Sequence, residues 1–230
     1  MHNYSTVGAE TYKHLPVFAH KGLHEYVEKL VHESLLPGAM VLELGSGSGA
    51  FSLRLLDSGF HLTCCDLTAE NFNITGNTTF IEADLNGAFE TKIEGTFDAV
   101  ISLEVIEHLE NPWQFLRGIM KLVQPGGAVI ISTPNIGSPR SILSFIKNGA
   151  FKYFQKWDFT PGGHITPISQ LHLVKIIEQA GFINVRVGSA GSPWGRGVRH
   201  LGAKILTLLM RNNPTKIGAI SVCIAERPKD

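Results

Sequence analysis

The residues best suited to ligand chemistry are three glycines, Gly45, Gly47 and Gly49, which follow an apolar run at 40–44. Because glycine has no Cβ, the backbone N–H groups of such a turn can approach a bound ligand closely. Residues 51–57 have the spacing of an amphipathic helix, so the turn joins a predicted strand to a predicted helix. A strand, a glycine-rich turn and a helix in this order are typical of a nucleotide-binding loop.

Three carboxylates stand close to predicted strand ends. Glu43 lies two residues before the first glycine, where it could bind a cationic ammonium group. Asp66 ends the second apolar run, where a carboxylate can accept hydrogen bonds from both hydroxyls of a ribose, and Asp84 follows the third run, within reach of an adenine amino group. The glycines also satisfy the dinucleotide fingerprint with Ala50 in the third place, so an NAD(P)-dependent oxidoreductase that uses the same Asp66 is an alternative.

Two histidines are candidates for acid–base chemistry. His108 lies just beyond the apolar run at 97–103, and His164 lies in a Gly-Gly-His sequence. Imidazole titrates near neutral pH and can remove a proton from a hydroxyl, although either histidine could instead only pack or orient a loop. If a helix begins here, Glu104, Glu107 and His108 share one face. With His164 they could bind a divalent metal, but we expect a site without one.

Alternating strands and helices must position these residues. Short apolar runs predict seven strands, at 40–44, 61–65, 79–82, 97–103, 128–132, 185–187 and 220–225. Helical spacing is found at 23–35, 51–57, 112–123 and 168–180, and Pro125-Gly126-Gly127 predicts a turn after the third of these helices. This alternation is typical of an α/β fold with a parallel sheet, which binds ligands at the carboxyl ends of its strands.

Taken together, these motifs resemble those of a class I S-adenosylmethionine-dependent methyltransferase. The matching pieces are VLELGSGSG, CCDL, EADL, FDAVISLEVIEHLENPWQFLRGIMKLVQPGG and AVIISTPN, which lie between residues 41 and 135. EVIEHL, PGG and STPN, with the later His164, are similar to the ubiquinone-biosynthesis type of O-methyltransferase. The resemblance implies a Rossmann-like doubly wound sheet of seven strands, mostly parallel with an antiparallel last strand. It also implies methyl transfer from S-adenosyl-L-methionine to an oxygen of a small-molecule or lipophilic acceptor.

The resemblance also implies a role for individual residues. Glu43 would meet the methionine ammonium group, Asp66 would hold the ribose, and Glu104 would help to close the site near the sulfonium. The residues implied to bind the cofactor are Glu43, Gly45, Ser46, Gly47, Gly49, Asp66, Leu67, Asp84, Leu85, Leu103 and Glu104. His108 and His164 are the candidate catalytic residues. Because some relatives with a similar string bind a metal, a metal-assisted RNA 2′-O-methyltransferase is a further alternative.

Composition and length indicate one globular domain. Of the 230 residues 43% are apolar, which excludes a disordered, collagen-like or coiled-coil chain. We expect a single methyltransferase domain over 1–230, with an N-terminal helical cap at 1–37 and insertions at 136–163 and 188–216 that shape the acceptor site. Three cysteines, a polar N-terminus and no apolar run long enough for a membrane span predict a cytoplasmic protein.

The formal net charge is zero, but the charges are unevenly divided. Residues 1–110 carry 16 acids and 5 bases, whereas residues 111–230 carry 4 acids and 15 bases. Within the basic half, residues 196–211 combine bases with apolar residues at helical spacing, which suits peripheral contact with an anionic membrane. A helix packed on the sheet edge is the alternative. We expect a small-molecule or lipid-linked acceptor and do not expect nucleic acid as a partner.

Overall fold

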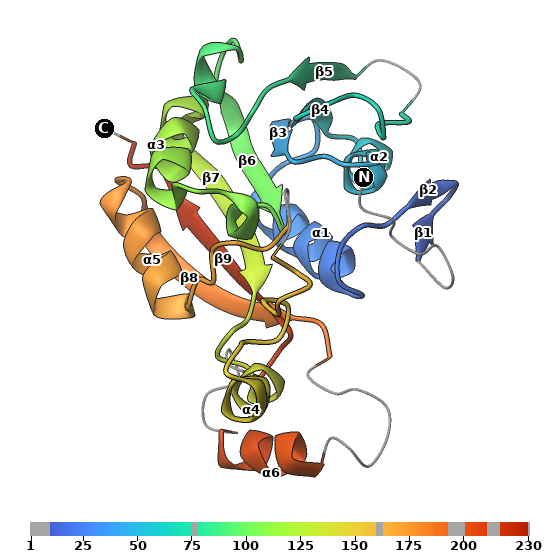
Figure 1. The fold of residues 1–230 in the computed structure, drawn as a ribbon. Helices are drawn as coiled ribbons and strands as arrows, with labels where there is room; N and C mark the ends of the chain where they lie inside the picture. The colour runs from blue at the N-terminus through green and yellow to red at the C-terminus, as the bar shows by residue number, and fades with distance from the viewer. Residues whose placement is uncertain (1–9, 75–77, 160–162, 193–200, 211–216, 230) are drawn as a thin grey trace.

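A seven-stranded sheet forms the centre of the molecule (Figure 1). The computed structural model describes residues 10–74, 78–159, 163–192, 201–210 and 217–229. The strands of the sheet are β3 (Met40–Leu44), β4 (His61–Asp66), β5 (Thr79–Glu82), β6 (Phe97–Leu103), β7 (Val123–Pro134), β8 (Ile183–Ala190) and β9 (Ile220–Glu226). They lie in the order β5-β4-β3-β6-β7-β9-β8, and β9 is antiparallel to both of its neighbours. This confirms the predicted α/β fold and its antiparallel last strand.

Helices cover both faces of the sheet. The helices α1 (Leu23–Ser34) and α2 (Ala50–Asp57) pack on one face, and α3 (Pro112–Leu122) and α5 (Gln170–Gln179) pack on the other. Neighbouring strand residues point to opposite faces. In β6, for example, Val100 packs in the α3–α5 layer and Ile101 in the α1–α2 layer. Burial on both sides explains why the central strands are continuous apolar runs rather than alternating ones.

Several element boundaries differ from the prediction, and hydrogen bonds explain two of the differences. The Ser169 hydroxyl accepts the N–H of His172, so α5 begins at Gln170 with a side-chain cap. The turn predicted at Pro125-Gly126-Gly127 is wrong, because β7 already begins at Val123. Gly126 donates to the Arg227 carbonyl and Arg227 donates to the Gly127 carbonyl, so this stretch pairs with the chain that follows β9.

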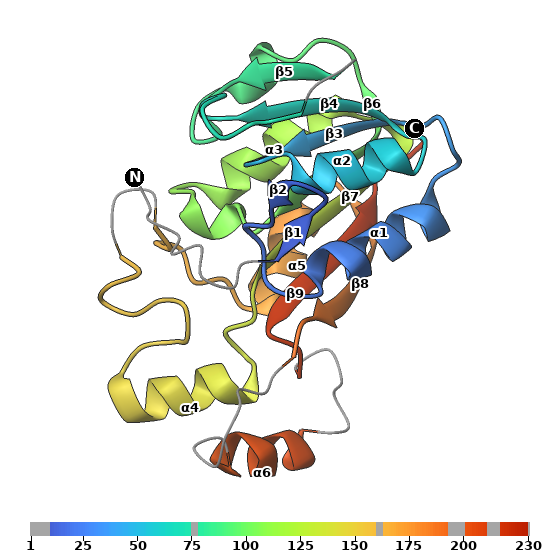
Figure 2. The same ribbon diagram turned by 90° about the vertical axis from the view of Figure 1, so that its right-hand side faces the viewer.

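Segments outside the sheet add elements that the sequence did not predict. A two-stranded hairpin, β1 (Thr11–Tyr12) and β2 (Leu15–Pro16), precedes α1, so the expected helical cap is partly a hairpin. The helix α4 (Pro139–Asn148) follows β7 and packs against α6 (Leu201–Leu209), away from the sheet (Figures 1 and 2). None of the described helices is long and apolar enough to cross a membrane.

Candidate active site

A pocket of about 430 Å³ lies at the carboxyl ends of the parallel strands, where doubly wound sheets bind ligands. Residues that follow β3, β4, β5 and β6 line it, as does His108. Gly49 is the one predicted cofactor residue that is not among the described residues lining it. The predicted cofactor residues that do line it are Glu43, Gly45, Ser46, Gly47, Asp66, Leu67, Asp84, Leu85, Leu103 and Glu104. The sequence therefore located ten cofactor residues and His108 in one pocket, about half of its lining, because strand ends in a parallel sheet converge on one edge.

The glycine turn is held against β4 by its backbone. Gly45 and Ser46 donate their N–H groups to the Cys65 carbonyl oxygen, at 2.7 and 3.2 Å. Gly45, Gly47 and Gly49 all have positive φ, at 81°, 53° and 84°. A Cβ on Gly45 would lie only 2.2 Å from Cγ2 of Val105, so the close approach of the two strand ends leaves no room for a side chain.

Gly45→Ala is expected to lower the free energy of unfolding by about 2–4 kcal/mol, from left-handed backbone strain together with overpacking. Gly59→Ala is the matched control, because Gly59 has a similar φ of 85° and no described atom lies within 4 Å of its ideal Cβ. Denaturant unfolding of both variants should show the larger loss at Gly45. Equal losses would mean that the contact with Val105 costs nothing.

Two of the acidic residues accept hydrogen bonds from nearby backbone. Asp66 accepts the N–H of Gly47 through Oδ2 and that of Leu67 through Oδ1, both at 2.7 Å. The exposed Asp84 accepts the N–H of Asn86 at 2.9 Å. Each carboxylate oxygen can accept more than one hydrogen bond. Asp66 is thus oriented by the glycine turn and can still accept hydrogen bonds from a ligand in the pocket.

Glu43 is buried beneath the glycine turn, with only 3% of its surface exposed. Its carboxylate accepts the hydroxyl of Ser52, and Ser52 also contacts the Cys64 thiol. Burial raises the pKa of Glu43 to about 8. A ligand cation in the pocket would favour the ionised form, which fits the predicted ammonium contact.

The raised pKa of Glu43 predicts a specific pH dependence of stability. Between about pH 4.5 and pH 8 the folded protein holds a proton that the unfolded chain has released, so stability falls as the pH rises through this window. Glu43→Gln removes this dependence. Relative to the variant, the parent should lose on the order of a few kcal/mol of unfolding free energy across the window. Denaturant unfolding of both proteins between pH 5 and pH 8 measures it, and parallel curves would contradict a protonated Glu43.

Glu104 ties the N-terminal segment to the site. It has a positive φ of 53°, and its carboxylate accepts the N–H of His20 at 2.6 Å. Ser48 donates its hydroxyl to the Pro16 carbonyl at 2.5 Å, so residues 16–20 cross over the glycine turn. Phe18, on this crossing segment, lines the pocket beside Gly47. Burial raises the pKa of Glu104 to about 7.

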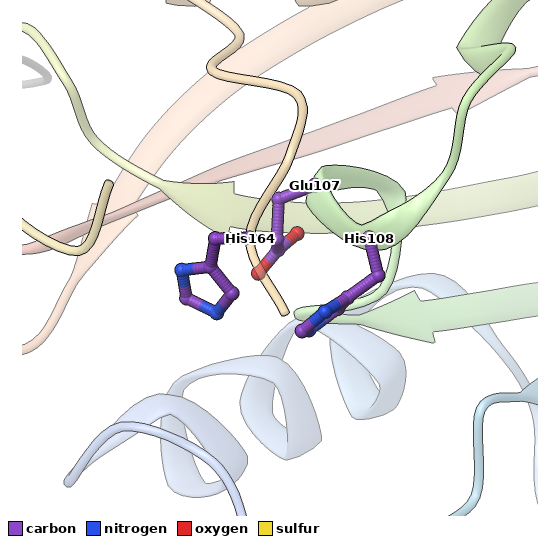
Figure 3. A group of neighbouring side chains, drawn as sticks. All are labelled: Glu107, His108 and His164. Carbon is purple, nitrogen blue, oxygen red and sulfur yellow. The ribbon is translucent and has the colours of Figure 1, made fainter. Parts of the chain in front are cut away.

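Glu107, His108 and His164 form a compact group beside this pocket (Figure 3). One ligand atom from each lies within 4.8 Å of those of the other two. Glu104 does not belong to the group, so the predicted shared helical face is wrong. The chain forms only a three-residue 3₁₀ helix at Ile106–His108, and Glu104 lies before it and binds His20.

Backbone hydrogen bonds bring His164 to this place. Ile165 and Thr166 both donate their N–H groups to the Glu107 carbonyl oxygen at 2.9 Å. The rings of His108 and His164 lie 4.7 Å apart and nearly perpendicular. His164 Nδ1 lies 2.7 Å from the Tyr153 carbonyl oxygen. A carbonyl can only accept, so Nδ1 carries a proton and Nε2 is the nitrogen that can take one up.

The Glu107 carboxyl group is fully buried behind the two histidines. Neither of its oxygens has a hydrogen-bond partner among the described residues. Burial, together with the nearby charge of Glu104, raises the pKa of Glu107 well above its ordinary value. A carboxyl group buried in this way is either protonated or balanced by a cation. The side chains of Glu107, His108 and His164 are also of the kinds that bind divalent metals.

Some lining residues were not predicted from the sequence. Ala19, His24 and Asn71 also line the pocket. Ala19 and His24 come from the N-terminal segment, and Asn71 lies beyond β4 in a stretch without periodicity. No local pattern marks such residues, because only the folded chain brings them to the pocket.

Comparison with known proteins agrees with this geometry. Residues 16–187 match a protein family described as a methyltransferase domain. The chain belongs to this family. The match covers most of the chain and confirms the expectation of a methyltransferase that was based on the motifs.

Two relatives of this methyltransferase domain share its sequence over part of their length. A ubiquinone biosynthesis O-methyltransferase from Caulobacter is 33% identical over 135 residues, which are 55% of this chain and 52% of that protein. An enzyme of the same name from Rickettsia bellii is 30% identical over 141 residues, which are 59% of this chain and 58% of that protein. The methyltransferase domain thus aligns with little more than half the length of these relatives.

Solved structures show the same fold. An S-adenosylmethionine-dependent methyltransferase from Archaeoglobus fulgidus has a TM-score of 0.59 at 17% identity, over 89% of this chain and 94% of the other. Magnesium protoporphyrin IX methyltransferase from Synechocystis, with bound S-adenosylhomocysteine, has a TM-score of 0.59 at 18% identity, over 89% and 81%. These structures confirm the predicted Rossmann-like fold of the methyltransferase domain.

Proposed function

We propose that this domain transfers a methyl group from S-adenosylmethionine to an oxygen of a small, lipophilic acceptor. The observation that carries the proposal is the pocket, which Glu43, Asp66 and Asp84 line together with the glycine turn and His108. The first three suit an ammonium group, a ribose and an adenine, and the histidine suits a hydroxyl that must lose its proton. The names of the Caulobacter and Rickettsia relatives support oxygen as the methylated atom.

The reaction is an in-line displacement at the methyl carbon. The acceptor oxygen forms a bond to that carbon while the bond from carbon to sulfur breaks, and the sulfonium becomes a neutral thioether. The hydroxyl proton passes to His108, which lines the pocket next to Leu103 and Glu104. The protein contributes alignment of the two reactants and a pocket that limits access of water.

His164 and Glu107 support His108 in this proton transfer. The Tyr153 carbonyl holds His164 in the tautomer whose Nε2 can accept a proton. The raised pKa of Glu107 favours the protonated form of its carboxyl group, which would leave no unbalanced buried charge even without a cation. In this scheme His108 is the first proton acceptor and His164 a second.

Calorimetry with S-adenosylhomocysteine and with NADH tests the donor. We expect the first to bind and the second not to, because Asp66 serves both classes of cofactor whereas Glu43 suits an amino-acid ammonium group. Turnover of phenols that carry alkyl chains of increasing length, followed by mass spectrometry, tests the acceptor. Binding of NADH without binding of S-adenosylhomocysteine would contradict the proposal.

A cation-assisted form of the same reaction is the second candidate. It is favoured by the grouping of Glu107, His108 and His164 and by the unpartnered oxygens of Glu107. In this form the three side chains would hold a divalent metal, which would polarise the acceptor oxygen and lower the pKa of its hydroxyl group.

Removal of metal distinguishes the two forms. For the metal-free site, dialysis against EDTA is expected to leave turnover unchanged. Metal analysis of the dialysed protein is the control that the treatment was complete. A loss of activity on dialysis would instead assign the three side chains to a cation, provided that Mg²⁺ or Zn²⁺ restores the activity of the parent and does not restore that of Glu107→Gln.

Peripheral membrane contact and a cytoplasmic location belong to the same proposal. The contact was predicted for residues 196–211, of which the structure describes 201–210. All four bases behind that prediction lie outside the described residues or have side chains that are not described: Arg196, Arg199, Lys204 and Arg211. The support that remains is the exposure of Ile205, Leu208 and Leu209 on α6.

A further inference from the structure

Exposed apolar side chains are concentrated on α4, α6 and the segment that follows α4. We call these parts, residues 139–159 and 205–209, the α4–α6 region. Its two helices lie at one end of the molecule, and the segment that follows α4 runs back toward the sheet (Figures 1 and 2). Half of the large apolar side chains that are exposed in the described part of the chain belong to it: Phe145, Ile146, Trp157, Phe159, Ile205, Leu208 and Leu209. Ile146 is 74% exposed and Trp157 is 73% exposed. Such clustering is unusual on a surface that only meets water.

The region is held together by packing and hydrogen bonds. α4 packs against α6. The ring of Phe145 stacks on that of Phe151 at 4.7 Å, and the Lys152 N–H donates to the Ser141 hydroxyl. The buried Gln155 side chain donates to the Ser144 hydroxyl at 3.1 Å. The segment after α4 is therefore anchored to that helix, although many of its apolar side chains face solvent.

The charges of the region are almost all positive. Residues 139–159 contain four bases, Arg140, Lys147, Lys152 and Lys156, and one acid, Asp158. Asp158 accepts the N–H of Gln155, and none of the four bases forms an ion pair within the described residues. The surrounding sequence is also poor in acids, since none occurs between residues 179 and 225. Apolar side chains mixed with unpaired bases complement an anionic lipid surface.

The same segment reaches the candidate catalytic histidines. The carbonyl oxygen of Tyr153 contacts Nδ1 of His164, and the His164 N–H donates to the Asp158 carbonyl at 3.1 Å. Phe154 lies against the His164 ring, with centroids 5.4 Å apart. The chain thus runs directly from Trp157 and Phe159 at the surface to the group of Glu107, His108 and His164.

We propose that the α4–α6 region docks on an anionic lipid bilayer and that the lipophilic acceptor reaches His108 from that bilayer. The inference rests on the proposed function, because it names where the acceptor of that reaction comes from. Charge favours lipid as the partner, because a symmetric contact of this region with the same region of a second copy would bring unpaired bases together. The apolar side chains enter the interfacial layer while the bases meet lipid headgroups.

Flotation of the whole chain with vesicles tests the docking. Vesicles of phosphatidylcholine with phosphatidylglycerol are compared with vesicles of phosphatidylcholine alone at low salt. We expect binding to the anionic vesicles only, and we expect raised salt to weaken it. Absence of the protein from the floated fraction at low salt would overturn the proposal.

Surface variants locate the contact. Ile146→Ser and Trp157→Ser are each expected to weaken vesicle binding about tenfold. Lys147→Glu and Lys156→Glu should each weaken binding to the anionic vesicles at least about fivefold. Leu36→Ser and Leu171→Ser are matched controls, because these leucines are 81% and 66% exposed elsewhere on the molecule. Equal losses in the controls would overturn the proposal.

Two further measurements separate docking from the reaction and from self-association. Without vesicles, the surface variants should bind S-adenosylhomocysteine and methylate a water-soluble phenol as the parent does. With vesicles, they should lose turnover of a long-chain alkylphenol. If the variants no longer methylate the water-soluble phenol, docking would be overturned. Docking would also be overturned if sedimentation velocity showed a dimer of the parent and only monomers of these variants. Vesicle binding by a parent that binds no S-adenosylhomocysteine would instead leave docking intact and refute the proposed function.

Discussion

His108→Ala is expected to lower kcat for a phenolic acceptor about 10²–10⁴-fold, the usual contribution of a positioned general base. The imidazole lines the same pocket as Leu103 and Glu104, the residues expected near the sulfonium. Because the glycine turn and Asp66 are left intact, binding of S-adenosylhomocysteine should stay close to that of the parent. The loss should therefore appear in turnover and not in donor affinity.

The pH profile gives a second readout of the same variant. With its first proton acceptor removed, the site reacts best with the ionised acceptor, so turnover of His108→Ala should rise with pH up to the pKa of the phenol. His61→Ala is the control, because His61 is an exposed histidine at the first position of β4, and the pocket lies at that strand's other end. A His108 variant that retains nearly full turnover, with the pH profile of the parent, would show that His108 only packs against His164.

Asp66→Ala should weaken S-adenosylhomocysteine binding by about 1–3 kcal/mol, or about 5–150-fold, because charged hydrogen bonds to the ribose are lost. The carboxylate lies at the end of β4 and is oriented by the N–H groups of Gly47 and Leu67. Titration calorimetry measures the loss. Unchanged affinity would contradict the ribose role.

A comparison of two variants separates the ligand role of Asp66 from its structural role. Asp66→Asn keeps an oxygen that can accept the Gly47 N–H but loses the charge. It also removes the acceptor of the exposed Leu67 N–H, so it should keep most of the unfolding free energy of the parent while donor affinity falls. If affinity falls only in Asp66→Ala and in step with stability, the residue acts by holding the glycine turn rather than by binding the ribose.

Local patterns were sufficient for the sheet and for the donor side of the pocket. Continuous apolar runs mark strands that are buried on both faces, as in β6, and helical spacing marks the layers that cover them. Gly45, Asp66 and Asp84 each lie within two residues of a strand end. Since parallel strands end at the same edge, the position of such residues in the chain already determines that they meet.

The acceptor side depends on contacts between distant parts of the chain. Glu104 accepts a hydrogen bond from His20, 84 residues away, and so leaves the helical face that its spacing suggested. His164 reaches His108 only because Ile165 and Thr166 bond to the Glu107 carbonyl. Hydrogen bonds of this kind have no periodicity, so the sequence named both histidines without showing that they meet.

The sequence by itself therefore determined the class of fold, the glycine turn with its neighbouring acids, and the two halves of opposite charge. Only the tertiary structure decided which residues Glu104 and Glu107 face, how residues 16–20 cross the pocket, and that α4 packs on α6. The physical reason is the distance along the chain between the residues that interact. Strand and helix patterns follow from the period of neighbouring residues, whereas loop docking depends on backbone groups that become neighbours only after the sheet has formed.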